Sequence, residues 1–210
     1  MFTTIIKGGP VMYPIILCSI IAFAIVIERV YHLHRARIDT RKFMDEIANV
    51  LKRNKIMEAI EMCDNTPGPI AHILKAGVLK HDRPKHEIKE SIEEAGLYEV
   101  PRLEKRLPML ATIAHIAPLL GLLGTVVGMV GCFQVIQEKS TSLNAVSPGD
   151  LAGGIWAALL TTAAGLVVAI PTYVAYNYLV NKVNSLVLDM ERSATDLTNI
   201  LTQRGKDYEV

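Results

Sequence analysis

The chain has 210 residues, of which 50% are hydrophobic and 20% are charged, and its formal net charge is +1. The charged residues avoid three long apolar blocks, so the sequence excludes an ordinary water-soluble domain and indicates a protein that crosses a membrane several times. The near-zero net charge offers no strongly basic character for nucleic acid, and we expect no nucleic acid partner.

Three apolar blocks are long enough to cross a bilayer, because a membrane helix needs about 20 mostly apolar residues. The blocks are Val11 to Val30, Pro108 to Gln137 and Leu151 to Val180. The first has no small-residue cleavage site and its basic residues follow it, so we expect it to remain as an anchor. We therefore predict an all-α membrane protein with three transmembrane helices, of which the second and third are long and extend into the cytoplasm, together with a small helical cytoplasmic domain.

The distribution of Lys and Arg predicts the orientation of these helices. Basic residues follow the first block and precede the second, whereas the loop between the second and third blocks has only Lys139 and the N-terminus has only Lys7. Since cytoplasmic flanks carry the excess of Lys and Arg, we expect the N-terminus outside and the C-terminus in the cytoplasm. The predicted organisation is an outer N-terminus with the first transmembrane helix (1–33), a cytoplasmic helical domain (34–107), the second transmembrane helix (108–137), an outer loop (138–150), the third transmembrane helix (151–180) and a cytoplasmic C-terminal helix and tail (181–210).

The cytoplasmic segment is predicted to begin with short amphipathic helices. Phe43, Ile47 and Leu51 recur every four residues after Thr40, which we expect to cap their helix. Two further short helices are predicted between turn-forming sequences, over Ile56 to Cys63 and Ile70 to Leu79.

A longer helix is predicted from Pro84 onward. Its acidic residues lie toward its start and its basic residues toward its end, which suits the helix dipole. Pro101 and Pro108 fall within it, but prolines are tolerated in membrane helices where neighbouring helices support the backbone. We therefore expect the prolines to kink this helix rather than to end it, and the helix to run into the second transmembrane helix.

After the third block, apolar residues alternate in steps of four and three, as they do along a coiled-coil seam. This stripe, which we call the heptad stripe, consists of Val183, Val187, Met190, Ala194, Leu197 and Leu201. It requires a partner helix, which is either the chain's own long helix or a helix of another subunit, and periodicity does not distinguish the two.

Small residues form one face of the second and third blocks. Membrane helices associate through close backbone packing, which small residues permit, so we expect tight helix contacts here, with neighbouring copies of the chain. Prolines at membrane depth should each remove a backbone hydrogen bond. The packing candidates are Gly121, Gly124 and Gly128 with Pro118 in the second block, and Ala157, Ala158 and Gly165 with Pro171 in the third.

Threonines at membrane depth are the candidate proton pathway. They are Thr125 in the second block and Thr161 and Thr162 in the third, where no carboxylate or ammonium is present. A threonine in a membrane helix usually returns its hydroxyl to a carbonyl one turn earlier, so packing is the alternative to a pore lining. Because a hydroxyl does not change charge near neutral pH, a pathway would need an ionisable group from elsewhere.

His115 is a titratable side chain in the second block, and its ordinary pKa allows it to carry a proton. It lies nine residues beyond Arg106, or roughly 13 Å of helix rise, so an interfacial or packing role is favoured. His81 and His86 lack the ligand spacing of a zinc site, and the glycines around Thr125 lack the lysine of a phosphate loop. We expect no metal, no cofactor and no enzymatic activity.

Two sequences carry a resemblance to a known family: APLLGLLGTVVGM at Ala117 to Met129, and GIWAALLTTAAGLVVAIPTYVAYN at Gly154 to Asn177. They strongly resemble the MotA/TolQ/ExbB proton channel family, and the three-span layout resembles its ExbB and TolQ branch. The resemblance implies a subunit of the bacterial inner membrane with a periplasmic N-terminus and protons as the coupling ion. It implies a pentamer around two copies of a single-span partner like ExbD or TolR, which energises a TonB-like or TolA-like effector for work at the outer membrane.

By motif position, the resemblance makes Thr125 and Thr162 the threonines that face the partner's transmembrane aspartate. The chain departs from many ExbB-like sequences at Ala157, where those sequences have a glutamate, so a second carboxylate in the pathway is not expected. A non-conducting oligomeric membrane scaffold is the alternative. A substrate transporter is less favoured, because the chain has no evident inverted repeat.

Overall fold

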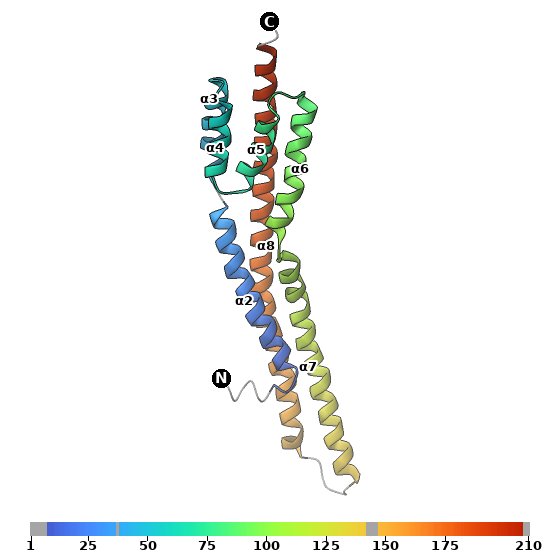
Figure 1. Ribbon diagram of the computed structural model, residues 1–210. Coiled ribbons are helices and arrows are strands. Elements are labelled where there is room, and N and C mark those ends of the chain that lie inside the picture. The colour runs from blue at the N-terminus through green and yellow to red at the C-terminus, as the bar shows by residue number, and fades with distance from the viewer. Residues whose placement is uncertain (1–7, 37, 142–146, 208–210) are drawn as a thin grey trace. The chain divides into compact units, whose positions relative to one another are not determined.

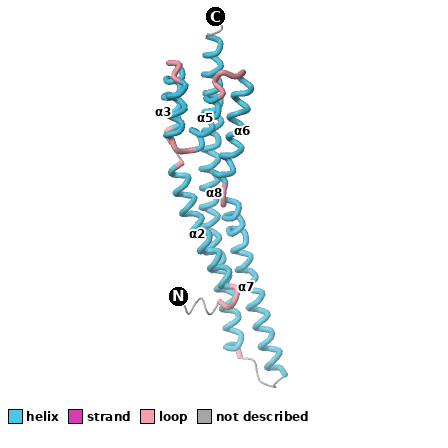
Figure 2. The backbone as a smooth tube through the Cα atoms, viewed as in Figure 1, coloured by secondary structure: helices cyan, strands magenta, loops and turns pink. Residues whose placement is uncertain are grey.

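The computed structural model describes residues 8–36, 38–141 and 147–207, except for the side chains of Thr141, Asp150 and residues 204–207. In these ranges the chain forms the helices α2 to α8, joined by short loops and without a strand (Figures 1 and 2). The all-α fold class is therefore confirmed. Lys7, residues 142–146 of the predicted outer loop and the last three residues of the predicted C-terminal tail lie outside the described residues.

The chain divides into two compact units. The first, called the membrane unit, contains α2 (Met12–Arg35) as far as Glu28 together with Arg106–Tyr178. The second, called the polar unit, contains Arg29–Lys105 and α8 from Leu179 onward. The chain passes from one unit to the other inside α2, after Lys105 and inside α8.

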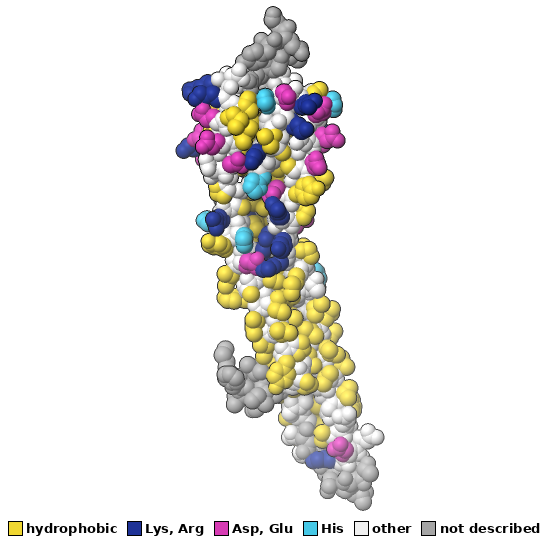
Figure 3. All heavy atoms as spheres, viewed as in Figure 1, with side chains coloured by type: hydrophobic (Ala, Val, Ile, Leu, Met, Phe, Trp, Pro, Cys, Tyr) yellow, Lys and Arg dark blue, Asp and Glu magenta, His cyan; other side chains and the backbone are white. Residues whose placement is uncertain are grey.

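The membrane unit is built from three apolar helices. They are α2, α7 (Leu107–Thr141) and α8 (Pro148–Asp207), and within the described part of the chain each is long and apolar enough to cross a membrane. Most of its large apolar side chains point outward, as Figure 3 shows for one face, and Leu119 and Val167 are 61% and 71% exposed. Such exposure is unfavourable in water and favourable in lipid, so the three predicted transmembrane helices are confirmed as membrane-spanning candidates.

The helices extend into the predicted outer loop from both sides. α7 ends at Thr141 and α8 begins at Pro148, whereas the sequence analysis placed the loop at 138–150. α8 then continues for 60 residues through Pro171. The expectation that the third apolar helix extends well beyond a membrane span is therefore confirmed.

The polar unit contains the short helices that the sequence predicts. They are α3 (Thr40–Lys52), α4 (Ile56–Asn65), α5 (Pro69–Leu79) and α6 (Lys85–Glu104). Their apolar faces bury a common core in which Ile47, Leu51 and Leu74 are almost fully inaccessible to solvent. Figure 3 shows charged side chains gathered over the exposed surface of this unit.

The cap of α3 differs from the prediction. Thr40 is already the first helical residue, and the N-cap is Asp39, whose Oδ1 accepts a hydrogen bond from the Lys42 amide over 3.2 Å. Asp and Thr are both good N-caps, so the apolar repeat alone did not decide between neighbours.

The helix that was predicted to run from Pro84 into the second span is divided by a two-residue turn. α6 ends at Glu104 and α7 begins at Leu107, and between them Arg106 has a left-handed backbone with φ of 66°. Pro101 lies inside α6 and Pro108 is the second residue of α7, where its missing amide hydrogen is not needed. In a continuous helix Pro108 would have no amide hydrogen for the Glu104 carbonyl, so it disfavours continuation of α6 into α7.

The heptad stripe is partly covered by the chain's own helices. Val183, Met190, Leu197 and Leu201 are buried in the polar unit, and Leu197 lies against Gly77 of α5. Val187 and Ala194 are half-buried and line an apolar groove of about 560 Å³ between α6 and α8. Packing within the chain thus accounts for most of the stripe.

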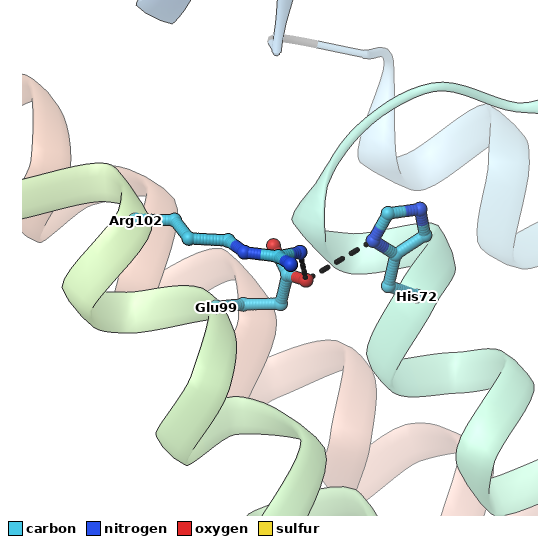
Figure 4. Close-up of polar contacts among 3 residues, drawn as sticks. All are labelled: His72, Glu99 and Arg102. Atoms are coloured by element: carbon cyan, nitrogen blue, oxygen red, sulfur yellow. Dashed lines mark hydrogen bonds and ion pairs between the residues drawn. The ribbon is translucent and has the colours of Figure 1, made fainter.

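A side-chain cluster joins α5 to α6 (Figure 4). The Glu99 carboxylate, which is largely buried, accepts from Arg102 over 2.8 Å and lies 3.1 Å from Nδ1 of His72. His72 and Arg102 are both exposed, so solvent screens these pairs and their contribution to stability is small.

Candidate functional site

The small residues of α7 and α8 lie against one another inside the membrane unit. A Cβ atom added to Gly128 would lie 2.7 Å from the Gly154 carbonyl oxygen and 2.9 Å from Cβ of Ala158. A Cβ added to Gly165 would lie 2.6 Å from the Ala117 carbonyl oxygen. These distances are shorter than contacts between real atoms, so the glycines allow the two backbones to approach closely. These contacts lie within one chain, and the predicted contacts with neighbouring copies stay a prediction.

Thr161 lies in the centre of this helix contact. Its side chain is fully buried, and a Cβ added to Gly124 would overlap its Oγ1 and Cβ atoms. The Thr161 hydroxyl donates to the carbonyls of its own helix, at 2.9 Å from Ala158 and 3.1 Å from Ala157. Its surroundings are those of a packing residue.

Thr162 reaches across to the other helix. Its Oγ1 lies 3.2 Å from the Gly121 carbonyl oxygen of α7 and 3.2 Å from the Ala158 carbonyl oxygen of α8. A hydroxyl has one hydrogen to donate, so it serves one of these acceptors at a time, while its oxygen stays able to accept a hydrogen bond. The side chain is half-buried, which leaves it in reach of a group outside this chain.

Thr125 lies one helical turn beyond Gly121, on the same face of α7. Its hydroxyl donates to the Leu122 carbonyl over 2.6 Å, and the residue is half-exposed. The structure therefore brings Thr125 and Thr162 to the same part of the helix contact with oxygen atoms that can still accept.

His115 lies apart from these threonines. It is exposed, its Nδ1 lies 2.7 Å from the Ala111 carbonyl oxygen, and its ring meets Tyr173 edge-on with centroids 6.3 Å apart. This local environment agrees with the interfacial or packing role that the sequence favours.

The remaining predicted positions differ in their burial. Ala157 is half-buried and precedes Thr161 by one turn, Pro118 is half-buried in α7, and Pro171 is exposed in α8. Pro171 also lines a small crevice of about 200 Å³ between α2 and α8. Within the described residues, no group of three or more His, Cys, Asp or Glu side chains is placed to hold a metal ion.

Two charged residues of α2, which were not candidates from the sequence, make contacts within their own units near the ends of α6 and α7. The Arg29 side chain, only 4% exposed, donates through Nη2 to the Leu103 carbonyl and lies 3.4 Å from the Arg102 carbonyl. The preceding residue, Glu28, forms an ion pair with Arg106. Their position in the sequence could have identified them as candidates, because both are charged and lie at the edge of an otherwise apolar helix.

Comparison with known proteins assigns the chain to a family. The model of the MotA/TolQ/ExbB proton channel family matches residues 65–192, which is more than half of the chain. The Tol-Pal system protein TolQ of Haemophilus influenzae is 32% identical and is matched over 89% of this chain and 85% of its own length. The biopolymer transport protein ExbB of Neisseria meningitidis serogroup A is 29% identical, with 94% of this chain and 96% of the relative covered.

A third relative, an ExbB homologue of Methanothermobacter thermautotrophicus, is 27% identical over 88% of this chain. The match covers 64% of that relative's length. The helix arrangement, the close α7–α8 contact and these similarities agree. The chain belongs to the MotA/TolQ/ExbB proton channel family, on its ExbB and TolQ branch.

Proposed function

We propose that this chain is the proton-channel and motor subunit of an energy-transducing complex in the bacterial inner membrane. In this proposal the complex uses the proton motive force to drive transport or mechanical work at the outer membrane. The relatives are named for biopolymer transport and for the Tol-Pal system, which supports the assignment.

The observation that carries the proposal is an incomplete polar site. Thr125 and Thr162 present half-exposed hydroxyls, yet residues 116–137 and 151–181 contain no Asp, Glu, Lys, Arg or His. Hydroxyls can hydrate and orient an acid, but they cannot take up and release a proton near neutral pH. The carrier is therefore a carboxyl group from another polypeptide.

That polypeptide is a single-span subunit like ExbD or TolR, present as a dimer inside a pentamer of this chain. One charge that moves through 100 mV gains about 2.3 kcal/mol, which is small beside the cost of an unpaired charge in lipid. The partner's carboxyl group must therefore be neutralised as it passes the hydroxyls. A TonB-like or TolA-like effector would receive the resulting motion.

The orientation in the proposal follows from the Lys and Arg distribution, with the N-terminus in the periplasm and the C-terminus in the cytoplasm. Protons are the coupling ion, and no cofactor or enzymatic step is involved. Thr161 contributes packing to the proposed pathway, whereas Thr125 and Thr162 contribute the hydroxyls that the partner meets.

A non-conducting oligomeric scaffold is the second candidate. It is favoured by one observation, namely that all three threonine hydroxyls donate to main-chain carbonyls, as in ordinary membrane helices. The glycine contacts between α7 and α8 serve a scaffold equally well.

Proton flux into liposomes separates the two functions. The chain is reconstituted with and without its single-span partner, and pH is followed by a dye inside the vesicles after a potential is applied. The proposal expects flux only when both proteins are present, and loss of that flux when the partner's transmembrane aspartate is replaced by asparagine. Absence of flux from the intact complex, with correct assembly, would establish the scaffold.

A further inference from the structure

His115 is the first side chain of the Asp, Glu, His, Lys or Arg type that lies between Thr125 and the start of α7. It precedes Thr125 by ten residues, or about 15 Å of helix rise, and residues 116–137 and 151–181 contain none of these types. In the orientation given by the Lys and Arg distribution, it lies on the cytoplasmic side of Thr125. A proton that leaves the hydroxyls toward the cytoplasm along α7 therefore meets His115 before any other such group.

The hydrogen bond of the imidazole ring decides which of its nitrogens is free. Nδ1 of His115 lies 2.7 Å from the Ala111 carbonyl oxygen. A carbonyl oxygen only accepts, so Nδ1 carries the hydrogen, and in the neutral ring Nε2 keeps its lone pair. The side chain is exposed on the membrane unit. Nε2 can thus gain and lose a proton while the bond to Ala111 stays in place.

Tyr173 of α8 places this ring beside the face that carries Thr162. The two rings meet edge-on, with centroids 6.3 Å apart and planes at 86°. Tyr173 follows Thr162 by eleven residues, or close to three helical turns, so both side chains lie on one face of α8, separated by about 16 Å of helix rise. Thr125 and Thr162 therefore lie toward one end of this stretch of α7 and α8, and His115 and Tyr173 lie toward its cytoplasmic end.

We propose that His115 is the proton-release residue of the channel, which takes the proton from the partner's carboxylic acid through water and passes it to the cytoplasm. This inference rests on the proposed function and deepens it. The O–H bond of the acid breaks and an N–H bond forms at Nε2, which leaves a carboxylate and an imidazolium. The Nε2–H bond then breaks, its proton goes to water on the cytoplasmic side, and the ring returns to its neutral form.

The surroundings of His115 suit a group that must release its proton again. Within the described part of the chain the ring forms no ion pair, and the titratable side chain that it meets on α8 is Tyr173 rather than a carboxylate. A carboxylate beside the ring would stabilise the imidazolium and retain the proton. Packing against Tyr173 is the alternative role, and it needs only the shape of the ring.

Proton flux into liposomes that contain this chain and its single-span partner tests the release role. His115→Gln keeps a polar side chain but cannot take up a proton, and we expect flux to fall by roughly 100-fold, the effect of losing a positioned acid–base group. His86→Gln, at an exposed histidine of the polar unit, is the control and should leave flux unchanged. If the parent complex conducts and His115→Gln conducts equally well, the release role is overturned while the proposed function stands. If the assembled parent complex does not conduct, both fail.

Rescue by a small base separates proton release from packing. In His115→Ala we expect added imidazole to restore part of the flux, because it supplies the missing basic nitrogen. Pyrazole, a ring of the same size and far lower basicity, should restore none. Equal flux with the two compounds would overturn the proposal, because a packing role does not distinguish them.

Nitrogen NMR of isotope-labelled histidine in the parent complex, held in lipid nanodiscs, does not depend on the stability of any variant. We expect Nδ1 of His115 to stay protonated and Nε2 to gain its proton reversibly between about pH 5 and 8. A neutral ring with its hydrogen on Nε2, or a ring that does not titrate in this range, would contradict the release role.

Discussion

The Thr162 hydroxyl of α8 lies 3.2 Å from the Gly121 carbonyl oxygen of α7, and it is the one of the three candidate threonines whose hydroxyl bonds to the other helix. Since Gly121 has no side chain, Thr162 can approach its backbone closely. The hydroxyl oxygen keeps lone pairs that can accept from a protonated carboxylic acid.

Thr162→Val is expected to impair proton-dependent work strongly while assembly stays intact. Valine preserves the side-chain shape but cannot accept a hydrogen bond, so the partner's acid would pass this point without a partner; a buried polar group left unsatisfied costs about 1–3 kcal/mol, and flux should fall by roughly 5- to 150-fold. Liposome flux with the partner measures this. Thr162→Ser should retain flux, and Thr195→Val, which removes a local hydroxyl-to-carbonyl bond in the polar unit, should leave it unchanged. Full activity of Thr162→Val would refute the pathway.

Ala157→Glu probes whether the position at which related sequences carry a glutamate lies on the proton path. An added carboxylate would supply a second titratable group one turn before Thr161, and we expect it to change the pH dependence of flux. Ala157→Gln, of similar size and without a titratable group, is the control. Identical flux curves for the glutamate and glutamine variants would place residue 157 off the path.

Gly124→Ala is expected to destabilise the α7–α8 contact, because the new methyl group would overlap Thr161. Overpacking a helix contact costs about 1–3 kcal/mol. Thermal unfolding in detergent, or denaturant titration, measures the change. Gly131→Ala in the same helix is the control, because a Cβ there meets no atom within 4 Å. Equal stability of the two variants would mean that α7 and α8 are not closely packed at Gly124.

Gly77→Ala applies the same reasoning to the polar unit. A Cβ at Gly77 would lie 2.7 Å from Cδ1 of Ile92 and 2.9 Å from Cδ2 of Leu197. Both atoms are ends of flexible side chains that can shift, and alanine favours a helix over glycine by about 1 kcal/mol, so we expect Gly77→Ala to be less stable than its control by about 1 kcal/mol or less. The control is Gly96→Ala, where a Cβ meets nothing within 4 Å and the change should be neutral or slightly stabilising. Gly77→Ala as stable as Gly96→Ala would contradict the packing of α8 on α5.

Cys63 should resist alkylation in the folded protein. Burial raises the pKa of its thiol to about 11, and the neighbouring Asp64 carboxylate adds to the shift while Lys75 opposes it. Because the pKa of this thiol is higher in the folded protein than its ordinary value, the neutral thiol stabilises the folded state. This contribution is complete at pH values below the ordinary thiol pKa and is lost as the pH rises toward 11. Iodoacetamide at pH 8, followed by mass spectrometry, should modify Cys63 only after denaturation. Rapid labelling of folded protein at pH 8 would show that the thiol is accessible and ionised.

Several elements of the fold could be predicted from sequence because their signals are local. The spacing of Phe43, Ile47 and Leu51 predicted α3, and the turn-forming sequences around Pro69 predicted the bounds of α5. The cap of α3 was placed one residue late, since Asp39 and Thr40 offer similar cap chemistry.

The candidate site could be predicted only in part. Glycine and threonine spacing pointed to Thr125, Thr161 and Thr162 together, but it did not separate the fully buried Thr161 from the two half-exposed residues. That difference depends on the rotation of α8 against α7, which adjacent residues in one helix do not reveal. The left-handed backbone at Arg106 was not predicted, because arginine is an ordinary helix former and rarely adopts that conformation.

The sequence by itself determined the helical class, the three apolar helices and the family, since hydropathy, helical periodicity and motif letters are properties of short segments. Only the tertiary structure decided which threonine reaches a carbonyl of the other helix and where the long cytoplasmic helix stops. The first outcome depends on the rotation of α8 against α7, which brings Thr162 and not Thr161 to the Gly121 carbonyl. The second depends on the left-handed backbone at Arg106, a conformation that a helix-forming residue does not signal in sequence.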